Sequence, residues 1–374
     1  MRILVTGGAG FIGSHLADAL VAAGDEVVLY DNLDPQVHGP ARERPRYLDP
    51  DLPLVVGDIR NSELLRHTLL EHRIDAIFHE AAAVGVGQSM YQLRKYTDVN
   101  TVGTAALLEA LVDTKHPIQK IVVASSMSIY GEGSYVCPEH GLVAPRPRGQ
   151  EQMAERRWEM ECPSCGGQVT ARATREDKPL VPTSVYATTK RDQEELVLEF
   201  GQAYDVPAVA LRYFNVYGER QALSNPYTGV AAIFASSLLN GNAPRVFEDG
   251  KQSRDFTHVS DIVAANLLAL RSDAANGGSF NVGTGIPTSI ERVAVVLAEK
   301  LGVDVGIELL GMSRAGDIRH CYADIELTKS TLGFEPRVTF EDGMEELAKW
   351  LQGEHAEDRG AAALEELATH KLAR

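Results

Sequence analysis

The chain has 374 residues, of which 44% are hydrophobic, and its 52 Asp and Glu against 36 Lys and Arg give a net charge of -16. Such a length and apolar content suffice for one large domain or two unequal ones. The acidic balance argues against nucleic-acid or anionic-membrane partners, because either would require a local basic patch. The first residues, MRILVTGGAG, lack the zones of a signal peptide, and no apolar run approaches the roughly 20 residues of a membrane span. We therefore expect a cytoplasmic protein with reduced thiols.

Short apolar strands alternate with amphipathic helical segments through the first half of the chain. The strand-like runs are RILVT, EVVLY, LPLVV, AIFHEA and KIVVASS, and helical stretches such as FIGSHLADALVAAG and SELLRHTLLEHR separate them. Strands rich in Val, Ile and Leu that alternate with helices are typical of a parallel sheet covered on both faces. The sequence predicts a Rossmann-type, doubly wound α/β fold.

The second half predicts a helix from about Ser184 to Tyr204, a buried strand in PAVALRYFNVYG, and then a smaller mixed α/β domain. That domain is expected to cap the carboxyl edge of the sheet, where ligands bind in such folds. The charged, alanine-rich end of the chain is expected to be a flexible tail. The predicted boundaries are 1–214 with part of 255–285 for the Rossmann domain, 131–182 for an insert within it, 215–254 and 286–352 for the second domain, and 353–374 for the tail.

A glycine-rich turn after the first strand predicts a dinucleotide site. Gly7, Gly10 and Gly13 in GGAGFIG open a helix, so that pyrophosphate can approach the backbone amides at the helix N-terminus. An ordinary strand-to-helix turn is the alternative for a bare glycine motif. Asp31 favours the dinucleotide, because it ends the next strand where a carboxylate accepts both ribose hydroxyls; alternatively, it caps a loop or helix. The same carboxylate would repel a 2′-phosphate, which favours NAD over NADP.

Tyr186 and Lys190 in SVYATTK are four residues apart and therefore share one helical face. An ammonium beside a phenol stabilises the phenolate, so that the tyrosine can act as general base or acid. A second pair, Tyr91 and Lys95, has the same spacing, and we interpret it as a half-exposed surface pair.

Position in the chain favours the first pair. The helix of Tyr186 follows the fifth strand, whose end carries Ser125, Ser126 and Ser128. A hydroxyl at a strand end can hold the substrate oxygen within reach of both the tyrosine and the nicotinamide. Asp58 and Ile59, at the end of the third strand, are placed to frame the adenine.

Eleven motifs occur here in the order and spacing of the extended short-chain dehydrogenase/reductases. They are TGGAGFIGSHL, YDNL, GDIR, HEAA, VNTVGT, SSMSIYG, YATTK, RYFNVYG, RDFTHVSDI, FNVGTG and RAGDIRHCYAD. The chain resembles the NAD-dependent epimerase/dehydratase group, which acts on nucleotide sugars, over about residues 1–350 outside the insert. The resemblance implies tightly held NAD, a C-terminal domain that binds a nucleotide-diphosphate sugar, and a homodimer formed through paired helices near 89–114 and 184–204.

The resemblance also implies site residues. The catalytic trio maps onto Ser126, Tyr186 and Lys190. The cofactor residues it implies are Gly7, Gly10, Phe11, Ile12, Gly13, Asp31, Asn32, Asp58, Ile59, Ala81, Ala82, Asn100, Tyr186 and Lys190. The substrate residues it implies are Ser128, Asn215, Val230, Arg254, Arg314 and Asp317. An isolated arginine is commonly a solvated surface group, but these lie in motifs that grip the diphosphate, and Asp317 either orients an arginine or caps a helix.

The residues after Ser126 bear on the reaction. Sugar 4,6-dehydratases of this group carry Asp-Glu there, whereas this chain has Met127 and Ser128, which cannot supply the second proton transfer of an elimination. The resemblance therefore implies a 4-epimerase that works through a transient 4-keto sugar. A nucleotide-sugar dehydratase, reductase or dehydrogenase is another enzyme reading, and a regulatory Rossmann protein that senses NAD is a non-enzyme reading.

Two features bear on the substrate. The insert and PYTGVAAIF, from Pro226 to Phe234, resemble bacterial enzymes proposed as dTDP-L-rhamnose 4-epimerases, which interconvert dTDP-L-rhamnose and dTDP-6-deoxy-L-talose. UDP-glucose, UDP-galactose and UDP-glucuronate stay as alternatives, because thymine and uracil differ by one methyl group.

The insert contains three of the four cysteines in the chain. Cys137 and His140 form one knuckle-like pair, and Cys162 and Cys165 form another. This is the ligand number, type and spacing of a closed structural zinc site; free thiols or an adventitious disulfide are the alternative. Cys321 lies outside and is expected to be a small buried side chain. Since the insert leaves the chain between Ser126 and Tyr186, we expect it to cover the sugar pocket and to select the sugar.

Overall fold

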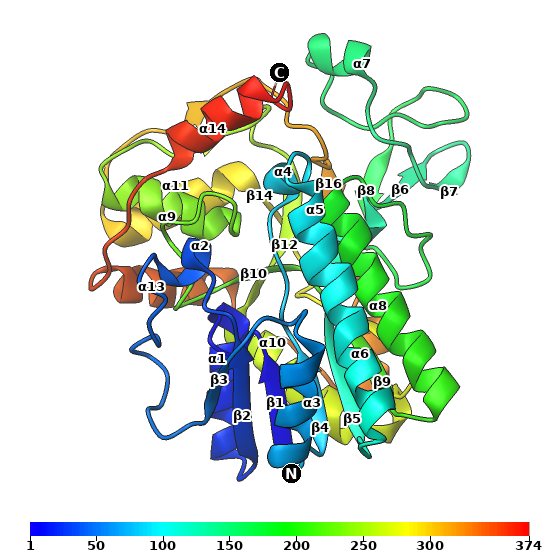
Figure 1. Cartoon of the computed structure of the whole chain (residues 1–374). Coiled ribbons are helices and arrows are strands. Elements are labelled where there is room, and N and C mark those ends of the chain that lie inside the picture. The colour runs from blue at the N-terminus through cyan, green and yellow to red at the C-terminus, as the bar shows by residue number, and fades with distance from the viewer. Residues whose placement is uncertain (374) are drawn as a thin grey trace.

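The computed structural model describes residues 1–373 and is built on a seven-stranded sheet (Figure 1). All neighbouring strands in it are parallel. The strands, in the order β13-β9-β5-β4-β1-β2-β3, are Ser279–Val282, Ala208–Tyr213, Lys120–Ser126, Ala76–His79, Arg2–Thr6, Glu26–Asp31 and Leu54–Val56. The order reverses beside β1, which makes the switch point at which ligands bind in such sheets. The predicted Rossmann-type fold is confirmed.

Two separate cores cover the faces of this sheet because side chains alternate along each strand. On β1, Ile3 and Val5 join the core beneath α1 (Phe11–Ala22) and α10 (Val259–Arg271). Leu4, between them, joins the opposite core. The helices of that opposite core are α3 (Ser62–Glu71), α6 (Gly103–Thr114) and α8 (Val185–Tyr204).

A second part of the chain forms its own core above the carboxyl edge of the sheet. Tyr217, Phe234 and Leu347 are among its buried residues. Its helices are α9 (Val230–Leu239), α11 (Ile290–Leu301) and α13 (Phe340–Leu351). Its strands are β10 (Asn215–Tyr217), β12 (Ser253–His258), β14 (Pro287–Ser289) and β16 (His320–Cys321), with a separate pair of β11 (Arg245–Val246) and β15 (Glu308–Leu309).

Short elements connect these parts. They are α2 (Pro35–His38), α4 (Val86–Ser89), α5 (Leu93–Tyr96), the π-helix η1 (Thr97–Val102), the 3-10 turns η2 (Met127–Tyr130) and η3 (Asp273–Ala275), and α12 (Glu326–Leu332). Within residues 1–373, no helix is both long and apolar enough to cross a membrane.

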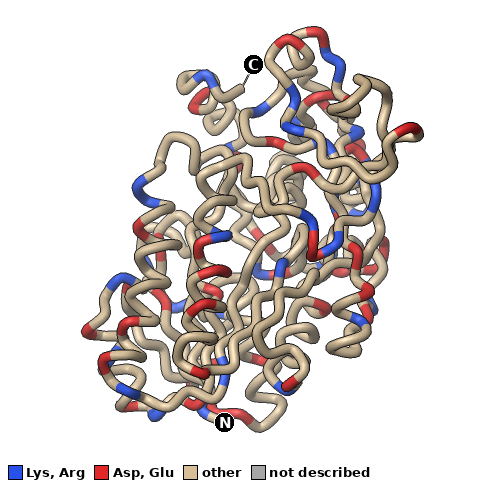
Figure 2. Tube along the Cα trace, turned by 90° about the vertical axis from the view of Figure 1, so that its right-hand side faces the viewer, with Lys and Arg blue, Asp and Glu red and all other residues tan. Residues whose placement is uncertain are grey.

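The insert is a small three-stranded unit with one short helix, and it stands at the edge of the molecule (Figure 1). Its elements are β6 (Ser134–Cys137), β7 (Gly141–Val143), α7 (Gln150–Ala154) and β8 (Thr170–Arg172). Arg148 makes a bidentate ion pair with Glu248, at 2.8 and 2.9 Å, and both side chains are buried. This pair ties the insert to the second part of the chain. Figure 2, which views the side that carries α8 and the insert, shows charges of both signs interspersed.

The end of the chain differs from the expected flexible tail. Residues Gly360–Thr369 form α14, in which Ala363 and Leu367, four positions apart, are buried. The backbone of Leu372 accepts a hydrogen bond from Ala315 at 2.7 Å. The apolar stripe is only two residues wide within an alanine-rich, charged segment, so composition alone suggests a tail. Tertiary contacts with residues distant in sequence anchor it instead.

Candidate active site

A cavity of about 580 Å³ lies between the carboxyl edge of the sheet and the second part of the chain. One continuous wall includes the glycine turn, the ends of β4 and β5, and the start of α8; the opposite wall comes from residues 213–256 and 314–318. Of the predicted site residues outside the metal cluster, Asp58 and Asn100 do not line it, and all the others do. Segments far apart in sequence therefore meet at one site.

The glycine turn packs so closely on neighbouring backbone that side chains would not fit at two of its positions. Gly7 has φ +69°, and a Cβ there would lie 2.8 Å from the backbone nitrogen of Ala81. A Cβ on Gly13 would lie 2.3 Å from the carbonyl oxygen of Gly7. Helix α1 begins at Phe11, directly after this turn, and Gly10 at its N-cap has no side chain to occupy the helix end. Backbone amides and the helix dipole at this point suit an anionic diphosphate.

Asp31 lies at the end of β2 and lines the same cavity. Its carboxylate accepts hydrogen bonds from the backbone nitrogens of Ala9, at 3.0 Å, and Leu33, at 2.8 Å. It thus ties the glycine turn to its own loop, which is the loop-capping role that the sequence also allows. Each carboxylate oxygen can accept a further bond, so the position also suits ribose hydroxyls. The residues fit a bound NAD on these grounds.

The two predicted cofactor residues outside the cavity have other partners. Asp58 pairs with Arg60 through two bonds of 2.8 and 2.7 Å, and the Arg60 hydrogen bond lowers the pKa of its carboxyl. Asn100 is buried, accepts from the backbone nitrogen of Ala83 at 2.7 Å, and donates to Thr189 at 2.9 Å. Asn100 therefore positions the backbone that follows Ala81 and Ala82, one layer behind the cavity surface.

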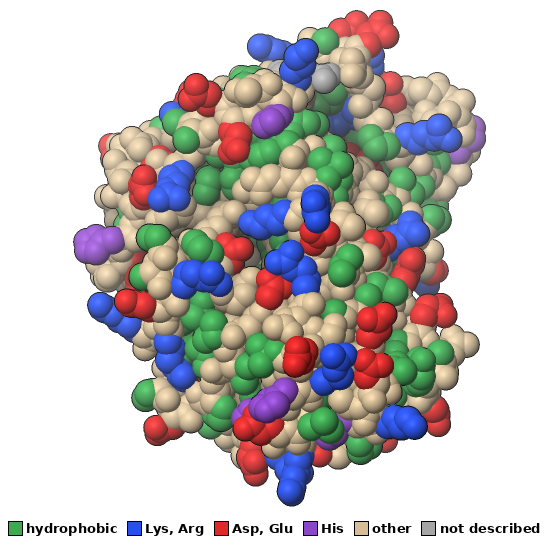
Figure 3. Space-filling view, viewed as in Figure 1, with side chains coloured by type: hydrophobic (Ala, Val, Ile, Leu, Met, Phe, Trp, Pro, Cys, Tyr) green, Lys and Arg blue, Asp and Glu red, His purple; other side chains and the backbone are tan. Residues whose placement is uncertain are grey.

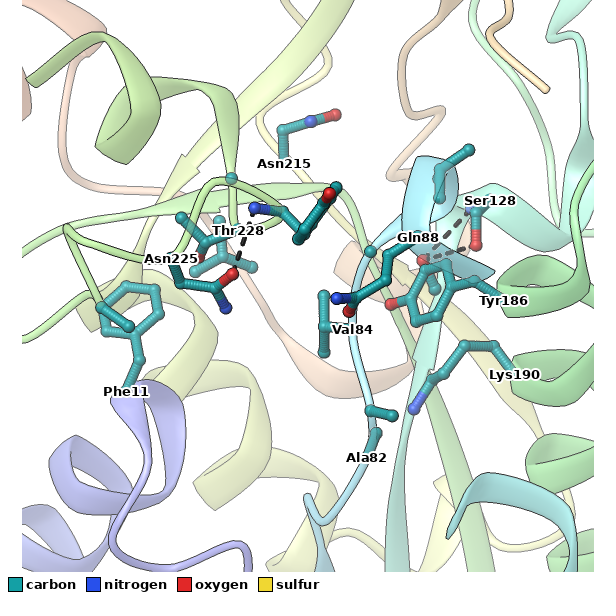
Figure 4. Close-up of a pocket in the computed structure, with 18 of the residues that line it drawn as sticks. Phe11, Ala82, Val84, Gln88, Ser128, Tyr186, Lys190, Asn215, Asn225 and Thr228 are labelled. Atoms are coloured by element: carbon teal, nitrogen blue, oxygen red, sulfur yellow. Dashed lines mark hydrogen bonds between the residues drawn. The ribbon is translucent and has the colours of Figure 1, made fainter. Parts of the chain in front are cut away.

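Ser126 ends β5, and Tyr186 and Lys190 lie in the first turns of α8; all three line the cavity. Figure 4 shows Tyr186 and Lys190 there, beside Ser128. Ser184 caps α8 by accepting from the backbone nitrogen of Ala187 at 3.1 Å, which fixes where the helix begins. The hydroxyl of Ser128 donates to Ser126 at 2.9 Å. The strand end and the helix start therefore present the three side chains to one point of the cavity.

The electrostatics of the trio differ in one respect from the sequence-based expectation. Burial raises the pKa of the Tyr186 phenol, and a hydrogen bond with Ser126 lowers it. The sequence predicts the Lys190 ammonium as the dominant influence; in the structure its Nζ donates to Gln193, one turn along α8, at 2.7 Å. Gln193 is buried and in turn contacts His79 at 3.1 Å. Sequence reasoning missed this anchor of the lysine.

The competing pair does not form a second centre. Tyr91 lies in the turn after α4 and Lys95 in α5, so they do not share one helical face. The Tyr91 hydroxyl donates to the hydroxyl of Tyr227 at 2.7 Å, and Lys95 donates to Gln36 at 3.1 Å. Each side chain thus has a separate structural partner.

Glu80 is a half-buried carboxyl next to the trio that the sequence did not single out. The Tyr213 hydroxyl donates to it at 2.8 Å, and burial raises its pKa. Burial lowers the pKa of Lys190, and the negative charges of Glu80 and Glu194 raise it again. Glu80 therefore helps to keep Lys190 charged.

The Glu80→Gln variant is expected to shift the alkaline limb of kcat/KM to lower pH. Without this carboxylate the pKa of Lys190 falls, so the ammonium loses its proton at a lower pH, while Gln still accepts from Tyr213. The pH profile of turnover measures the shift. Glu109→Gln, an exposed site on α6, is the matched control and is expected to leave the profile unchanged. An unmoved limb in Glu80→Gln would refute the coupling.

The substrate half of the cavity contains amide oxygens without protein partners. Within residues 1–373, Asn215 Oδ1, Gln221 Oε1 and Gln252 Oε1 are buried and have no hydrogen-bond partner, and all three side chains line the cavity. A buried polar atom left unpaired is costly, so these atoms suit a polar ligand. Asn215 was predicted from its motif, whereas Gln221 and Gln252 were not, because nothing local marks them.

The predicted arginines line the cavity but are held by the protein. Arg254 donates to the carbonyl oxygens of Ile318, at 2.6 Å, and Arg319, at 3.0 Å. Arg314 makes a bidentate pair with Asp317, at 2.9 to 3.1 Å, which favours an orienting role for Asp317. Val230 begins α9 on the facing wall.

Gln88 is a further lining residue that the sequence did not indicate. Figure 4 shows it beside Tyr186. It is 5% exposed and accepts a hydrogen bond from Tyr96 at 3.0 Å. Its amide is therefore held in place at the end of the cavity that Tyr186 lines.

The predicted metal ligands come together in the insert. The donor atoms of Cys137, His140, Cys162 and Cys165 all lie within 4.8 Å of one another. Cys137 Sγ is 3.5 Å from His140 Nδ1 and 3.8 Å from Cys165 Sγ. Four such donors at these distances can surround one ion.

The expectation that the insert covers the sugar pocket is wrong. Among the described residues, those that line the cavity come from outside 131–182. Gly131, with φ +66°, turns the chain away after η2, and a Cβ there would lie 2.2 Å from the carbonyl oxygen of Val181. The insert thus leaves and returns at one narrow point. The amide of Gly133 then donates to His320 at 2.9 Å, which directs the insert toward the second part of the chain.

Comparisons with known proteins agree with this geometry. The profile of the NAD dependent epimerase/dehydratase family matches residues 3–150 and 163–283. A dTDP-L-rhamnose 4-epimerase of Burkholderia thailandensis is 34% identical over 353 residues, which cover 94% of this chain and 95% of that protein. A putative UDP-glucose 4-epimerase of Methanocaldococcus jannaschii is 30% identical over 351 residues, or 94% and 98% of the two chains.

Solved structures give the same result. The UDP-glucose 4-epimerase of Thermotoga maritima with UDP-glucose has a TM-score of 0.77 at 30% identity, and 94% of this chain and 99% of that one are covered. The Thermus thermophilus UDP-glucose 4-epimerase in complex with NAD has a TM-score of 0.75 at 30% identity and the same coverage. The family profile and these relatives span nearly all of the sheet and the cavity walls. The chain belongs to the NAD dependent epimerase/dehydratase family.

Proposed function

We propose that the protein is an NAD-dependent nucleotide-sugar 4-epimerase. The observation that carries the proposal is the meeting of Ser126, Tyr186 and Lys190 with the glycine turn in one cavity whose far wall carries unpaired amide oxygens. Met127 and Ser128, in place of an acid and base pair, disfavour elimination of water. The family relatives that bear the name 4-epimerase support the same activity.

In this proposal the protein moves one proton at the sugar. NAD, when bound, supplies the acceptor and later the donor of a hydride. Tyr186 Oη takes the proton of the C4 hydroxyl as that carbon loses its hydride, and Ser126 hydrogen-bonds the same oxygen. The transient 4-keto sugar then presents its other face, Tyr186 returns the proton, and C4 regains its hydrogen with inverted configuration. Lys190 provides positive charge beside these atoms.

We propose dTDP-L-rhamnose, interconverted with dTDP-6-deoxy-L-talose, as the substrate. The insert motif and the 34% identical dTDP-L-rhamnose 4-epimerase support it. UDP-glucose and UDP-glucuronate are the competing substrates, because relatives that carry those names are also similar. A panel of dTDP and UDP sugars, followed by NMR for inversion at C4, tests the proposal. Inversion of dTDP-L-rhamnose with the highest kcat/KM supports it, and preference for a UDP sugar refutes the substrate assignment.

The same assay distinguishes the epimerase from the other candidate functions. A dehydrogenase or reductase would change the amount of reduced cofactor during turnover, and a dehydratase would release a product that lacks one water. A regulatory NAD-sensing protein would bind the dinucleotide and turn over none of the panel. Any of these three outcomes would refute the epimerase.

We also propose that zinc occupies the cluster of Cys137, His140, Cys162 and Cys165. All four positions of a tetrahedral ion would be filled by protein, so the role is structural. The strands and the helix of the insert are short, and a bound ion would hold them in one arrangement. Its position away from the cavity agrees with a structural role and not with a catalytic one.

A homodimer through α6 and α8 is the proposed assembly. These helices lie side by side on one face (Figure 1), and Val112 and Tyr204 on them are exposed. Sedimentation equilibrium of the full chain tests it. A mass of two chains that falls toward one chain in Val112→Asp supports a dimer through these helices. A monomer at micromolar concentration refutes the proposed dimer.

A further inference from the structure

Residues 360–373, here called the C-terminal strap, do not line the cavity themselves but contact three segments that do. Figure 1 shows α14 beside α4, and the space-filling view of Figure 3 shows hydrophobic side chains gathered beneath this end of the molecule. Leu367 is 3% exposed. The strap therefore packs against the protein and does not project into solvent.

The first contact of the strap is with α4, the short helix after β4. Gly87 lines the cavity, and a Cβ on it would lie 3.1 Å from Leu367 Cδ2 and 3.7 Å from Arg314 Cδ. The leucine thus packs directly on the backbone of α4, next to an arginine of the facing wall. A larger residue at position 87 would displace the leucine.

The second contact is with Tyr227, on the loop before α9. Its hydroxyl donates to Glu366 and accepts from Tyr91, whose own ring stacks on His370 with centroids 4.4 Å apart and planes 8° apart. Tyr227 lines the cavity. Two residues of the strap therefore connect this loop to the turn after α4.

The third contact is with the segment that carries Arg314. Leu372 accepts from the backbone nitrogen of Ala315, at 2.7 Å, and Ala373 forms an antiparallel bridge with Arg314. The guanidinium of Arg314 lies 5.2 Å from the ring of Phe247 and lines the cavity. The strap thus fixes the backbone of a cation that a diphosphate can use.

We propose that the strap is a positioning element for the nucleoside diphosphate part of the substrate, with Glu366 and Leu367 as its positioning residues. It braces three cavity-lining segments that are distant in sequence. The segments of Tyr227 and Arg314 belong to the wall that faces the Rossmann half, the third is α4 after β4, and none of them is the glycine turn. Its loss is expected to weaken substrate binding while the Rossmann half still holds NAD. The inference rests on the proposed function only in naming the ligand class.

A chain that ends at Arg359 tests the proposal. It is expected to bind dTDP and UDP at least tenfold more weakly than the full chain by calorimetry, with unchanged NAD content. Turnover of the preferred sugar is expected to show a raised KM and a kcat within about threefold, because the trio is untouched. Unchanged affinity for both nucleotides would overturn the proposal. Calorimetry separates this failure from failure of the proposed activity, since it needs no turnover.

Point variants keep the test valid if the shortened chain does not fold. Glu366→Ala and Leu367→Ala are expected to weaken dTDP and UDP binding several-fold. Leu367→Met, which keeps a large apolar side chain, is expected to bind both nucleotides nearly as tightly as the unaltered protein does. Glu365→Ala makes the same charge change one residue away at an exposed position and is the matched control, expected to bind as the unaltered protein does. Equal affinities in Glu366→Ala, Leu367→Ala and Glu365→Ala, or loss of NAD together with the nucleotide, would overturn the positioning role.

Discussion

Replacing Tyr186 by Phe is expected to lower kcat by about 10²- to 10⁴-fold, the range of a general acid or base. The phenol oxygen is the only non-hydrogen atom removed, and the ring, whose centroid lies 6.4 Å from that of Tyr96 in the unaltered protein, is expected to stay packed against it. The cavity therefore keeps its shape, and KM is expected to change little. Inversion at C4, followed by NMR, measures the loss.

Tyr204→Phe is the matched control for this variant. Tyr204 is the last residue of the same helix, α8, and is 56% exposed. Its replacement by Phe is the same chemical change at a position that does not line the cavity. It is expected to retain full activity. Near-full turnover in Tyr186→Phe with retained NAD would remove this tyrosine from the mechanism.

The zinc proposal predicts the second large effect. Purified protein is expected to contain about one zinc ion per chain, and Cys165→Ser is expected to lose it. Loss of a bound structural ion removes free energy of folding, so Tm is expected to fall by about 5 °C or more. Metal analysis and thermal unfolding measure the two effects. Because the insert lies away from the cavity, kcat is expected to stay within about threefold.

Cys321→Ser provides the control for metal content. Cys321 is buried, lies outside the cluster, and has Thr174 Oγ1 as a partner at 3.7 Å. Its replacement is expected to leave the zinc content unchanged even if stability falls. Protein without zinc, together with an unaltered Tm in Cys165→Ser, would contradict a structural metal site.

Features set by local sequence could be predicted. The alternation of Ile3, Leu4 and Val5 between two cores follows from the pleat of a strand, and their apolar character marked the strand as buried on both faces. Parallel strands bring their carboxyl ends to one edge. The position of Ser126 at the end of β5 therefore predicts that it lies near Tyr186.

Features set by tertiary contacts could not be predicted. Nothing near Leu367 indicates that it packs on Gly87, and nothing near Asn100 indicates that it holds Ala83 and not the cofactor. The insert combines one feature that local sequence sets and one that tertiary contacts set. The spacing of Cys and His in the insert predicted the cluster. The direction in which the insert leaves the sheet depends on the turn at Gly131 and on the backbone hydrogen bond from Gly133 to the distant His320.

In the proposed mechanism hydrogen moves only between one bound sugar and the cofactor, and a substrate that carries deuterium at C4 measures this transfer. The epimer recovered from ordinary water is expected to keep all of its deuterium at C4, now inverted, and no reduced cofactor is expected to be released. A product with solvent hydrogen at C4, or with the label found elsewhere on the ring, would contradict it.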